Sequence, residues 1–266
     1  MRNLVASIVS AIAIAFAATT PAAAQQELRA GSECTYFPFN FRDTDGVLKG
    51  YDIDIGNELG KRLGVKIEWV CQKWDGMLPA LLANKFDLIL ASMSITEERR
   101  QRIDFSESYR VSIGQFVGAK NKGYKLFNAD NTPDPAAFKG VRVGLQRATT
   151  YDNWIQAKVP AATVVRYDTV EQLYLELKSG RVDVIMTNPM KTYLEFLSKP
   201  DGAGFEVVGP QLEDEKYFGT GVGVGVRKGN ADLLKRIDAA ILAMRKDGTL
   251  DGFSRKYFPW AIHPTN

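Results

Sequence analysis

Histidine and cysteine are scarce in this sequence, and their scarcity excludes several kinds of site. The chain of 266 residues contains one histidine, His263, and two cysteines, Cys34 and Cys71. Zinc sites take three or four ligands from cysteine and histidine, so we expect no metal site and see no signal for a cofactor. Ser-His-Asp and Cys-His sites need a histidine beside the nucleophile, whereas His263 precedes a proline near the last residue. We therefore predict no catalytic residue of these types.

An excess of charge of one sign is also missing. Lys and Arg total 34 and Asp and Glu total 31, which gives a net charge of +3. No block of basic residues is available to neutralise phosphates, so we expect no nucleic-acid partner. The hydrophobic share of 45% and the charged share of 24% are those of a globular protein and exclude a disordered chain. The length allows one large domain or two of about 100 residues.

The first 24 residues read as a secretory signal peptide. Arg2 is followed by a short apolar run from Leu4 to Ala18, and Ala22–Ala24 forms a site of small residues before Gln25. The alternative is a membrane helix, but the run is too short, and no other stretch reaches the roughly 18 apolar residues that a span needs. We expect cleavage after Ala24, export to the periplasm and no membrane insertion.

Export bears on the two cysteines. In an oxidising compartment they form, most simply, one disulfide, and the alternative is two buried thiols. Cys34 follows the predicted strand 28–32, and Cys71 ends the predicted strand 65–70. If these strands are parallel neighbours, both cysteines lie at the same edge of the sheet within bridging distance.

Strand and helix patterns alternate along the chain, which favours α/β sheets with mostly parallel strands. Apolar residues recur at helical spacing before Gly64, Gly180 and Gly248, glycines that end helices. Short apolar runs at residues 86–90, 141–145 and 182–186 are typical of strands buried on both faces. The glycine-dense segment 217–225 lacks the GxxxxGK[ST] pattern of a phosphate loop, so we interpret it as a strand that flexes or passes close to other backbone.

The segments 82–90 and 178–186 resemble each other. Each reads as a helix end, a turn, a basic residue, an apolar residue, an aspartate and an apolar strand, at an offset of 96 residues. Two similar α/β lobes explain this pattern, although any two βα units look alike. In open α/β sheets ligands bind at the carboxyl ends of strands, so facing lobes place the residues after both strands in one cleft.

Ser92, Ser94 and Arg99 form the clearest candidate cluster. They follow a predicted buried strand, and Thr96 can cap the helix that Glu97 and Glu98 open. A guanidinium group binds a carboxylate through two parallel hydrogen bonds, so Arg99 with two hydroxyls makes a carboxylate receptor. The alternative is a surface arginine paired with an acidic residue.

Further candidates follow other predicted strands. Thr149 and Thr150 begin a helix after strand 141–145, where free N–H groups bind anions or a plain cap forms. Tyr36 and Trp74 lie in loops and can stack on a ligand or pack in the core. Glu33 ends the first strand and can receive a cationic group.

Several ordered motifs together resemble one known family. They are Gly31, Thr35-Tyr36-x-Pro38-Phe39, Gly50-Tyr51-Asp52-Ile53-Asp54, Trp74-Asp75-Gly76-Met77-Leu78-Pro79, Ser94-Ile95-Thr96-x-x-Arg99, Tyr217-Phe218-Gly219, Val226-Arg227-Lys228, Asp247-Gly248-Thr249 and Lys256-Tyr257-Phe258. The pattern resembles the solute-binding proteins of polar amino acid ABC transporters, which include the histidine- and lysine/arginine/ornithine-binding proteins. The resemblance spans essentially the whole exported chain.

The resemblance implies a periplasmic-binding-protein type II-like α/β fold, with two lobes that close around a ligand. Lobe 1 is expected at 25–110 and 222–266, lobe 2 at 114–212, and hinge strands at 111–113 and 213–221. By resemblance, Arg99 and Ser94 hold the ligand α-carboxylate, helped by backbone N–H groups near Ser92 and at Thr149 and Thr150. Tyr36 and Trp74 sandwich the ligand side chain, and Glu33 matches a position that is acidic in binders of basic amino acids. The partners implied are a small amino-acid-like ligand and an ABC permease, with the protein itself a monomer.

One position departs from the family. The aspartate that pairs with the ligand α-ammonium falls on Asn188, and Gln146 occupies another ligand-facing position. Losing one partner of a buried charge pair costs about 2–5 kcal/mol. Either another acid compensates and the ligand is a plain basic amino acid, or the ligand nitrogen is substituted, as in an opine.

The function expected is binding without chemistry. The rival is an enzyme on the same scaffold, similar to the periplasmic cyclohexadienyl dehydratases, with Glu33 as its general acid or base. A sensory receptor domain is a third possibility, but we see no segment after the fold that could cross a membrane. We expect a binding protein and no enzyme.

Overall fold

The computed structural model describes residues 26–263, so the predicted signal peptide and its cleavage site lie outside the described residues. The strands are β1 Glu27–Ser32, β2 Thr35–Tyr36, β3 Asn40–Arg42, β4 Leu48–Lys49, β5 Lys66–Cys71, β6 Leu88–Ile89, β7 Ile103–Phe105, β8 Gly114–Ala119, β9 Arg142–Gln146, β10 Thr163–Tyr167, β11 Val184–Thr187, β12 Phe205–Leu212 and β13 Gly225–Arg227. The α-helices are α1 Tyr51–Leu63, α2 Met77–Leu82, α3 Glu97–Arg100, α4 Thr150–Lys158, α5 Val170–Lys178, α6 Pro189–Thr192, α7 Glu215–Phe218, α8 Ala231–Lys246 and α9 Thr249–Tyr257.

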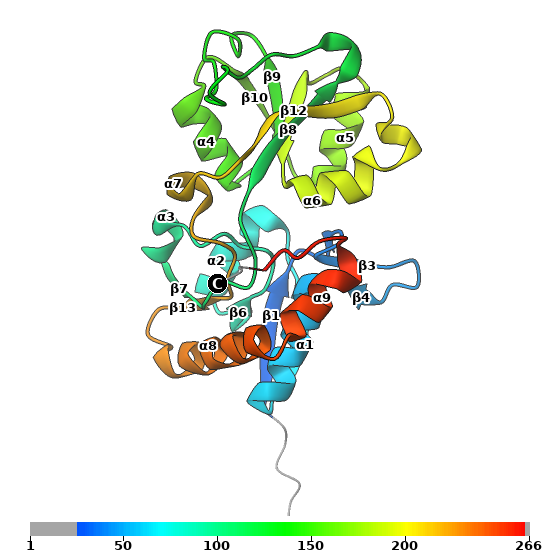
Figure 1. Cartoon of the computed structure of the whole chain (residues 1–266). Coiled ribbons are helices and arrows are strands. Elements are labelled where there is room, and N and C mark those ends of the chain that lie inside the picture. Colours follow the sequence, from blue (N-terminus) through cyan, green and yellow to red (C-terminus); the bar gives the residue numbers. More distant parts are fainter. Residues whose placement is uncertain (1–25, 264–266) are drawn as a thin grey trace, which may run out of the picture.

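Two five-stranded sheets with the same plan form two lobes (Figure 1). Lobe 1 is built on the order β5-β1-β6-β13-β7, and lobe 2 on the order β10-β9-β11-β8-β12. In each sheet the first three strands are parallel, and the fourth is antiparallel to both of its neighbours. That fourth strand, β13 or β8, arrives in each case from the other lobe. The predicted α/β fold of two lobes is confirmed.

The repeated sequence pattern corresponds to equivalent positions in the two lobes. Asp87, just before β6, accepts hydrogen bonds from the backbone N–H and the side chain of Arg29. Asp183, just before β11, does the same for Arg142 in lobe 2. In both lobes the arginine guanidinium holds the pKa of the aspartate below its usual range. The two segments are therefore the same structural unit used twice.

Helices cover both faces of each sheet, so the strands that the sequence predicts as continuously apolar are buried. In lobe 1, α1, α8 and α9 cover one face and α2 the other; in lobe 2, α4 and α5 lie on opposite faces (Figure 1). Glycines end these helices as predicted: Gly64 follows α1 with φ of 70°, and Gly180 closes the turn after α5 with φ of 69°. A capping box between Thr169 and Gln172 begins α5.

The chain crosses between the lobes twice, from β7 to β8 and from β12 to β13. An isolated bridge between Arg110 and Val222 ties the two crossing segments together. The predicted hinge segment 213–221 is not a continuous strand, because it contains the short helix α7. The glycine-dense segment passes close to other backbone, as predicted: a side chain at Gly219 would collide with the carbonyl of Ile95. The lobe boundaries themselves stay a prediction.

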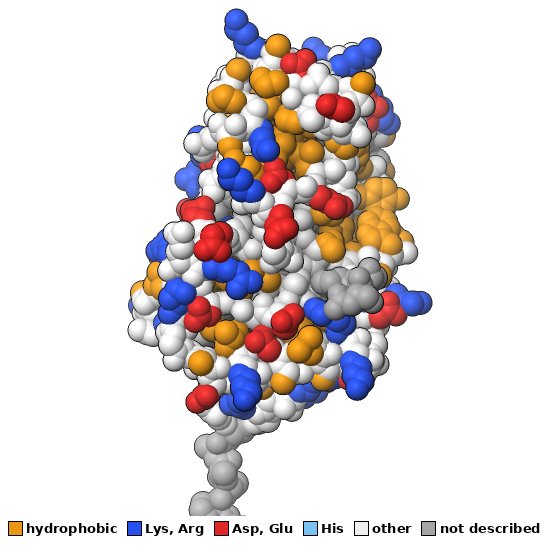
Figure 2. All heavy atoms as spheres, turned by 60° about the vertical axis from the view of Figure 1, so that its left-hand side comes forward, with side chains coloured by type: hydrophobic (Ala, Val, Ile, Leu, Met, Phe, Trp, Pro, Cys, Tyr) orange, Lys and Arg blue, Asp and Glu red, His pale blue; other side chains and the backbone are white. Residues whose placement is uncertain are grey.

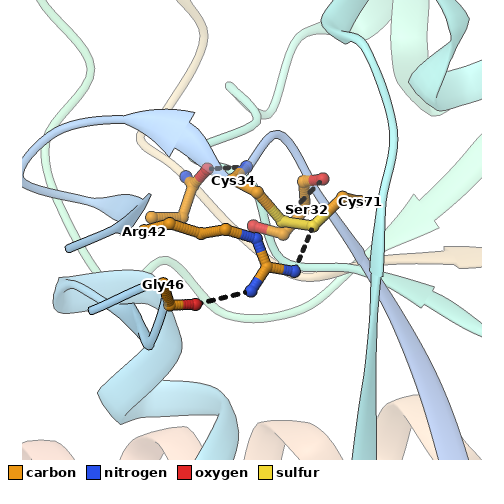
Figure 3. The surroundings of a disulfide bond; sticks show 6 residues. Ser32, Cys34, Arg42, Gly46 and Cys71 are labelled. Atoms are coloured by element: carbon orange, nitrogen blue, oxygen red, sulfur yellow. Dashed lines mark hydrogen bonds between the residues drawn. A yellow bond between two sulfur atoms is a disulfide. The ribbon is translucent and has the colours of Figure 1, made fainter. Parts of the chain in front are cut away.

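The predicted disulfide joins Cys34 and Cys71 (Figure 3). Strands β1 and β5 are parallel neighbours with Ser32 opposite Cys71, so the two Cα atoms lie 5.6 Å apart. The guanidinium group of Arg42 lies over the bridge and donates to the Gly46 carbonyl at 2.9 Å and to the Cys71 sulfur at 3.5 Å. The disulfide therefore fixes the two loops that follow these strands.

The surface carries charge of both signs. Figure 2 shows basic and acidic side chains interspersed over one face of both lobes, in keeping with the small net charge. Between residues 26 and 263, no helix has the length and hydropathy needed to span a bilayer. The same part of the chain has no group of three or more His, Cys, Asp or Glu side chains placed to hold a metal ion.

Candidate ligand-binding site

A cavity of about 40 Å³ lies between the lobes. All ten residues that the sequence predicts as ligand-binding line it: Glu33, Tyr36, Trp74, Ser92, Ser94, Arg99, Gln146, Thr149, Thr150 and Asn188. Most of them follow the carboxyl ends of strands in the two five-stranded sheets, where open α/β sheets bind ligands. The structure thus brings the predicted set together, while their contacts with a ligand stay a prediction.

Arg99 is held in the cavity wall by its own helix. Thr96 caps α3 by accepting a hydrogen bond from the Arg99 N–H at 3.3 Å. The Arg99 side chain turns back, donates to the Ser94 carbonyl at 3.0 Å, and lies 5.3 Å from the ring centre of Trp74. Burial lowers the pKa of Arg99 to about 10, so the group is charged at neutral pH. No ion pair within residues 26–263 includes Arg99, which excludes the alternative of a paired surface arginine.

The serine hydroxyls beside Arg99 have different partners. Ser92 donates to Asp52 at 2.8 Å, and Ser94 shares a hydrogen bond of 2.8 Å with Ser112. Ser92 has φ of 54°, a left-handed conformation that costs a non-glycine residue about 1–3 kcal/mol. Strain of this kind concentrates at functional sites, where the surrounding structure maintains it.

Lobe 2 contributes the start of α4 to the cavity. Thr149 occupies the N-cap position, but its hydroxyl donates to the Gln146 carbonyl at 2.7 Å instead of capping the helix. The alternative of a plain side-chain cap is therefore wrong for Thr149. The start of α4 therefore has no capping side chain, and Thr149, Thr150 and Tyr151 line the cavity there. An uncapped helix start of this kind can bind an anion.

Hydrogen bonds between the lobes close the cavity. The Trp74 indole donates to the Ala148 carbonyl at 3.1 Å, and the Gln146 amide donates to Glu33 at 2.7 Å. Lys191, fully buried, lies 4.9 Å from the Tyr36 ring centre and donates to a carbonyl of the other lobe. Tyr36 also packs on the core beside it, so its ring contributes to both core and cavity. Trp74 and Gln146 thus link the lobes as well as lining the site.

Among the described residues, Glu33 is the one acidic side chain that lines the cavity, and its pKa is raised to about 7. Burial is the main cause, and the nearby charges of Glu171 and Asp75 add to it. The hydrogen bond from Gln146 and the charge of Lys191 act in the opposite direction but do not offset burial. Near neutral pH the cavity therefore holds a carboxyl group that is close to half protonated.

The raised pKa of Glu33 predicts a pH-dependent stability of the ligand-free protein. Between pH 4.5 and about 7 the unfolded chain ionises this carboxyl while the folded chain keeps it protonated, so its contribution to stability falls as pH rises. We expect Glu33→Gln to stabilise the protein at pH 8 relative to wild type and to leave it unchanged at pH 4. Urea unfolding at both pH values measures this, with Glu68→Gln, exposed on β5, as control. If Glu33→Gln changed the free energy of unfolding equally at both pH values, this result would contradict the raised pKa of Glu33.

Asn188 occupies the N-cap position of α6, and its side-chain oxygen caps the helix. That oxygen accepts the N–H groups of Met190 at 3.0 Å and Lys191 at 3.2 Å. Asn188 is 2% exposed and lines the cavity, so it offers its NH₂ group, a donor, where an aspartate offers a second negative oxygen. The position therefore favours an acceptor on the ligand over an ammonium group.

Sequence reasoning missed four polar residues that line the cavity, namely Arg110, Ser112, Tyr151 and Thr187. Arg110 and Ser112 lie in the first crossing segment, and Tyr151 donates from α4 to the Ile113 carbonyl at 2.9 Å. Arg110 directly precedes the predicted hinge segment 111–113, but no local sequence pattern there places its side chain in the cavity.

Comparison with known proteins identifies the family of this chain. Residues 28–259 match the bacterial extracellular solute-binding proteins, family 3. The chain belongs to this family. It is 37% identical over 262 residues to the L-arginine-binding protein of Pseudomonas aeruginosa, covering 98% of both chains. It is 32% identical to the lysine/arginine/ornithine-binding periplasmic protein of Escherichia coli, covering 99% of each.

A solved structure confirms the fold of this family 3 protein. It is similar to an ancestral arginine-binding protein bound to arginine, with a TM-score of 0.76 and 36% sequence identity. The match covers 88% of this chain and 99% of the other. The predicted resemblance to amino acid solute-binding proteins is therefore confirmed at the level of family and fold.

Proposed function

We propose that this family 3 protein captures an amino acid or amino-acid derivative outside the cytoplasm and delivers it to an ABC importer. The observation that carries the proposal is the Arg99 guanidinium, held in the wall of an interlobe cavity without a carboxylate partner among the described residues. A partly buried cation without an ion-pair partner among the described residues favours an anionic ligand group. The amino-acid-binding relatives named above support the same class of ligand.

In this proposal the ligand carboxylate binds Arg99 and Ser94, with N–H groups at the start of α4 completing the site. Tyr36 and Trp74 flank the ligand side chain, and Glu33 receives a polar or cationic end of it. The crossing segments act as a hinge, since the contacts between Trp74 and Ala148 can form only when the lobes approach. We also propose that the signal peptide directs export to the periplasm. There the protein is a monomer and binds the permease of the transporter.

Asn188 decides between a plain amino acid and a derivative. If the ligand nitrogen is substituted, we expect Asn188→Asp to weaken its binding and to strengthen binding of L-arginine by about 10- to 100-fold, because a hydrogen bond to a charged group contributes about 1.5–3 kcal/mol. Isothermal titration calorimetry measures both, with Asn128→Asp, exposed in lobe 2, as control. Tight binding of unmodified arginine by wild type, unaffected by Asn188→Asp, would argue for a plain basic amino acid.

The enzyme alternative has one observation in its favour, the pKa of Glu33 near 7, which suits a general acid or base. Against it, Glu33 is bonded to Gln146, and the relatives named above are binding proteins. We propose that the chain does no catalysis. Incubation with a cyclohexadienyl acid, followed by absorbance, is expected to show no turnover; turnover that Glu33→Gln abolishes would establish the enzyme.

A further inference from the structure

Lys191 carries a buried positive charge that the ligand site does not use directly. Its side chain is 0% exposed, and within residues 26–263 it is the one lysine that is fully buried. Three oxygen atoms surround its Nζ: Glu195 Oε2 at 2.7 Å, Glu171 Oε1 at 2.8 Å and the Phe37 carbonyl at 3.3 Å. An ammonium group has three N–H donors, and a lysine is fully buried only when it is paired. These three oxygens therefore satisfy the charge.

The partners of this ammonium group come from both lobes. Glu171 lies in the first turn of α5 and Glu195 in the helical turn after α6, so both carboxylates belong to lobe 2. The Phe37 carbonyl belongs to lobe 1, as does the Tyr36 ring, whose centre lies 4.9 Å from Nζ. Helix α6, which carries the lysine, lies at the edge of lobe 2 that faces lobe 1 (Figure 1). The contacts with Tyr36 and Phe37 therefore form only when the lobes approach.

Tyr36 connects this lysine to the ligand site. The tyrosine ring lines the cavity, whereas Lys191 does not. The backbone N–H of Lys191 bonds to the side-chain oxygen of Asn188, which also lines the cavity. The positive charge lies near enough to lower the pKa of Glu33, although burial of Glu33 has the larger and opposite effect. Lys191 thus lies behind the cavity wall and acts on a ligand only through that wall and through the contact between the lobes.

Opening of the cleft changes the surroundings of the charge. When lobe 1 moves away, the ammonium group loses the Phe37 carbonyl and the Tyr36 ring, and water takes their place. In the closed form the Glu195 side chain is 22% exposed, and burial raises its pKa while Lys191 acts in the opposite direction. Removing one partner of a buried ion pair is strongly destabilising because the other charge stays unpaired. Without the ammonium group this penalty falls mainly on the closed form, since the open form hydrates both carboxylates.

We propose that Lys191 is a positioning residue of the ligand site, which holds lobe 2 against Tyr36 and Phe37 of lobe 1 in the closed form. It acts through closure of the cleft and not through contact with the ligand. This inference rests on the proposed function, because it assumes that the lobes close around a ligand. It follows that Lys191 raises the affinity for every enclosed ligand by a similar factor, mainly through slower dissociation.

The test measures Kd by calorimetry and the dissociation rate by stopped-flow tryptophan fluorescence, with L-arginine, L-histidine, L-glutamine and N-(1-carboxyethyl)-L-arginine as probes. Lys191→Met is expected to bind every probe that wild type binds at least 10-fold more weakly, by similar factors and mainly through faster dissociation. The matched control is Lys178→Met, since Lys178 pairs with Asp201 at 2.6 Å inside lobe 2 and does not line the cavity. We expect this control to change each Kd less than threefold.

A further variant tests the physical reason for the loss. Lys191→Met combined with Glu171→Gln and Glu195→Gln removes the two carboxylates that the single variant leaves unpaired. We expect this triple variant to bind each probe at least threefold more tightly than Lys191→Met alone. A triple variant that binds no better than Lys191→Met would overturn the explanation by unpaired charge.

The outcomes separate this inference from the proposed function. A change in Kd below threefold in Lys191→Met, or a loss confined to one probe, overturns the role in closure and leaves Lys191 a counter-charge within lobe 2. If Lys191→Met does not fold, the partly exposed Glu171→Gln variant decides: it is expected to raise each Kd at least threefold, and an unchanged Kd overturns the role. If wild type binds none of the probes and no other free amino acid, the proposed function itself is overturned, and this inference with it.

Discussion

Replacing Arg99 by methionine is expected to raise the Kd of the bound amino-acid-type ligand by about 30-fold to several thousand-fold. The reason is the loss of a charge-assisted pair between the partly buried Arg99 guanidinium and the ligand carboxylate, and removing one partner of such a pair costs about 2–5 kcal/mol. Within residues 26–263 the guanidinium donates one hydrogen bond, to the Ser94 carbonyl at 3.0 Å, which leaves its other N–H groups for a ligand. Isothermal titration calorimetry with the tightest-binding compound measures the change.

The matched control for this variant is Arg100→Met, one residue further along α3. Arg100 is exposed and does not line the cavity, so its replacement removes the same charge without touching the site. We expect less than a threefold change in Kd for this control. Retention of wild-type affinity by Arg99→Met would contradict the carboxylate assignment.

Removing the disulfide is expected to lower the stability of the protein by about 4 kcal/mol. The bridge closes a loop with a sequence separation of 37 residues, and loop closure in the unfolded chain gives this order of magnitude. For a protein of this size the change corresponds to a fall in Tm of about 8–15 °C. The double variant Cys34→Ser with Cys71→Ser avoids a lone reactive thiol, and calorimetric unfolding measures the shift.

The same bridge has a consequence for binding. Cys34 is next to Glu33, and Cys71 precedes Trp74 by three residues, so the disulfide holds two loops of the cavity wall. We expect the double variant to bind ligand more weakly than wild type even below its Tm. Reduction of the wild-type protein with dithiothreitol should reproduce both effects; a variant with unchanged Tm would show that packing of β1 against β5 alone holds these loops.

Much of the fold could be predicted because local signals and burial agree. Gly64 and Gly180 mark helix ends, and the repeated aspartates at 87 and 183 mark the same strand in each lobe. The strand at 86–90 is shorter than expected, with only Leu88 and Ile89 in β6. Apolar runs report burial, and burial extends beyond the residues that pair with a neighbouring strand.

The candidate site was predictable where its residues follow strands and was missed where they lie in the crossing segments. Arg99 and Thr150 could be placed because a strand end and a helix start locate them. Arg110 could not, because its position depends on how β7 leads into β8, a tertiary arrangement without a periodic signature. The raised pKa of Glu33 also could not be predicted, because it depends on burial of the carboxyl group between the two lobes. The local sequence around Glu33 does not indicate how the lobes pack together.

A thermal-shift screen of the wild-type protein and Arg99→Met side by side tests most directly whether the protein binds an amino-acid-type ligand through Arg99. The panel contains arginine, ornithine, lysine, histidine, glutamine, glutamate, N-carboxyalkyl amino acids and simple carboxylates. At about 100 times its Kd a ligand stabilises the native state by about 2.7 kcal/mol, which raises the Tm by several degrees. We expect at least one amino acid or N-carboxyalkyl amino acid to raise the Tm of wild type and to raise the Tm of Arg99→Met less. A panel that leaves the wild-type Tm unchanged, or a rise in Tm of the same size in Arg99→Met, would contradict the assignment of Arg99 to the ligand carboxylate.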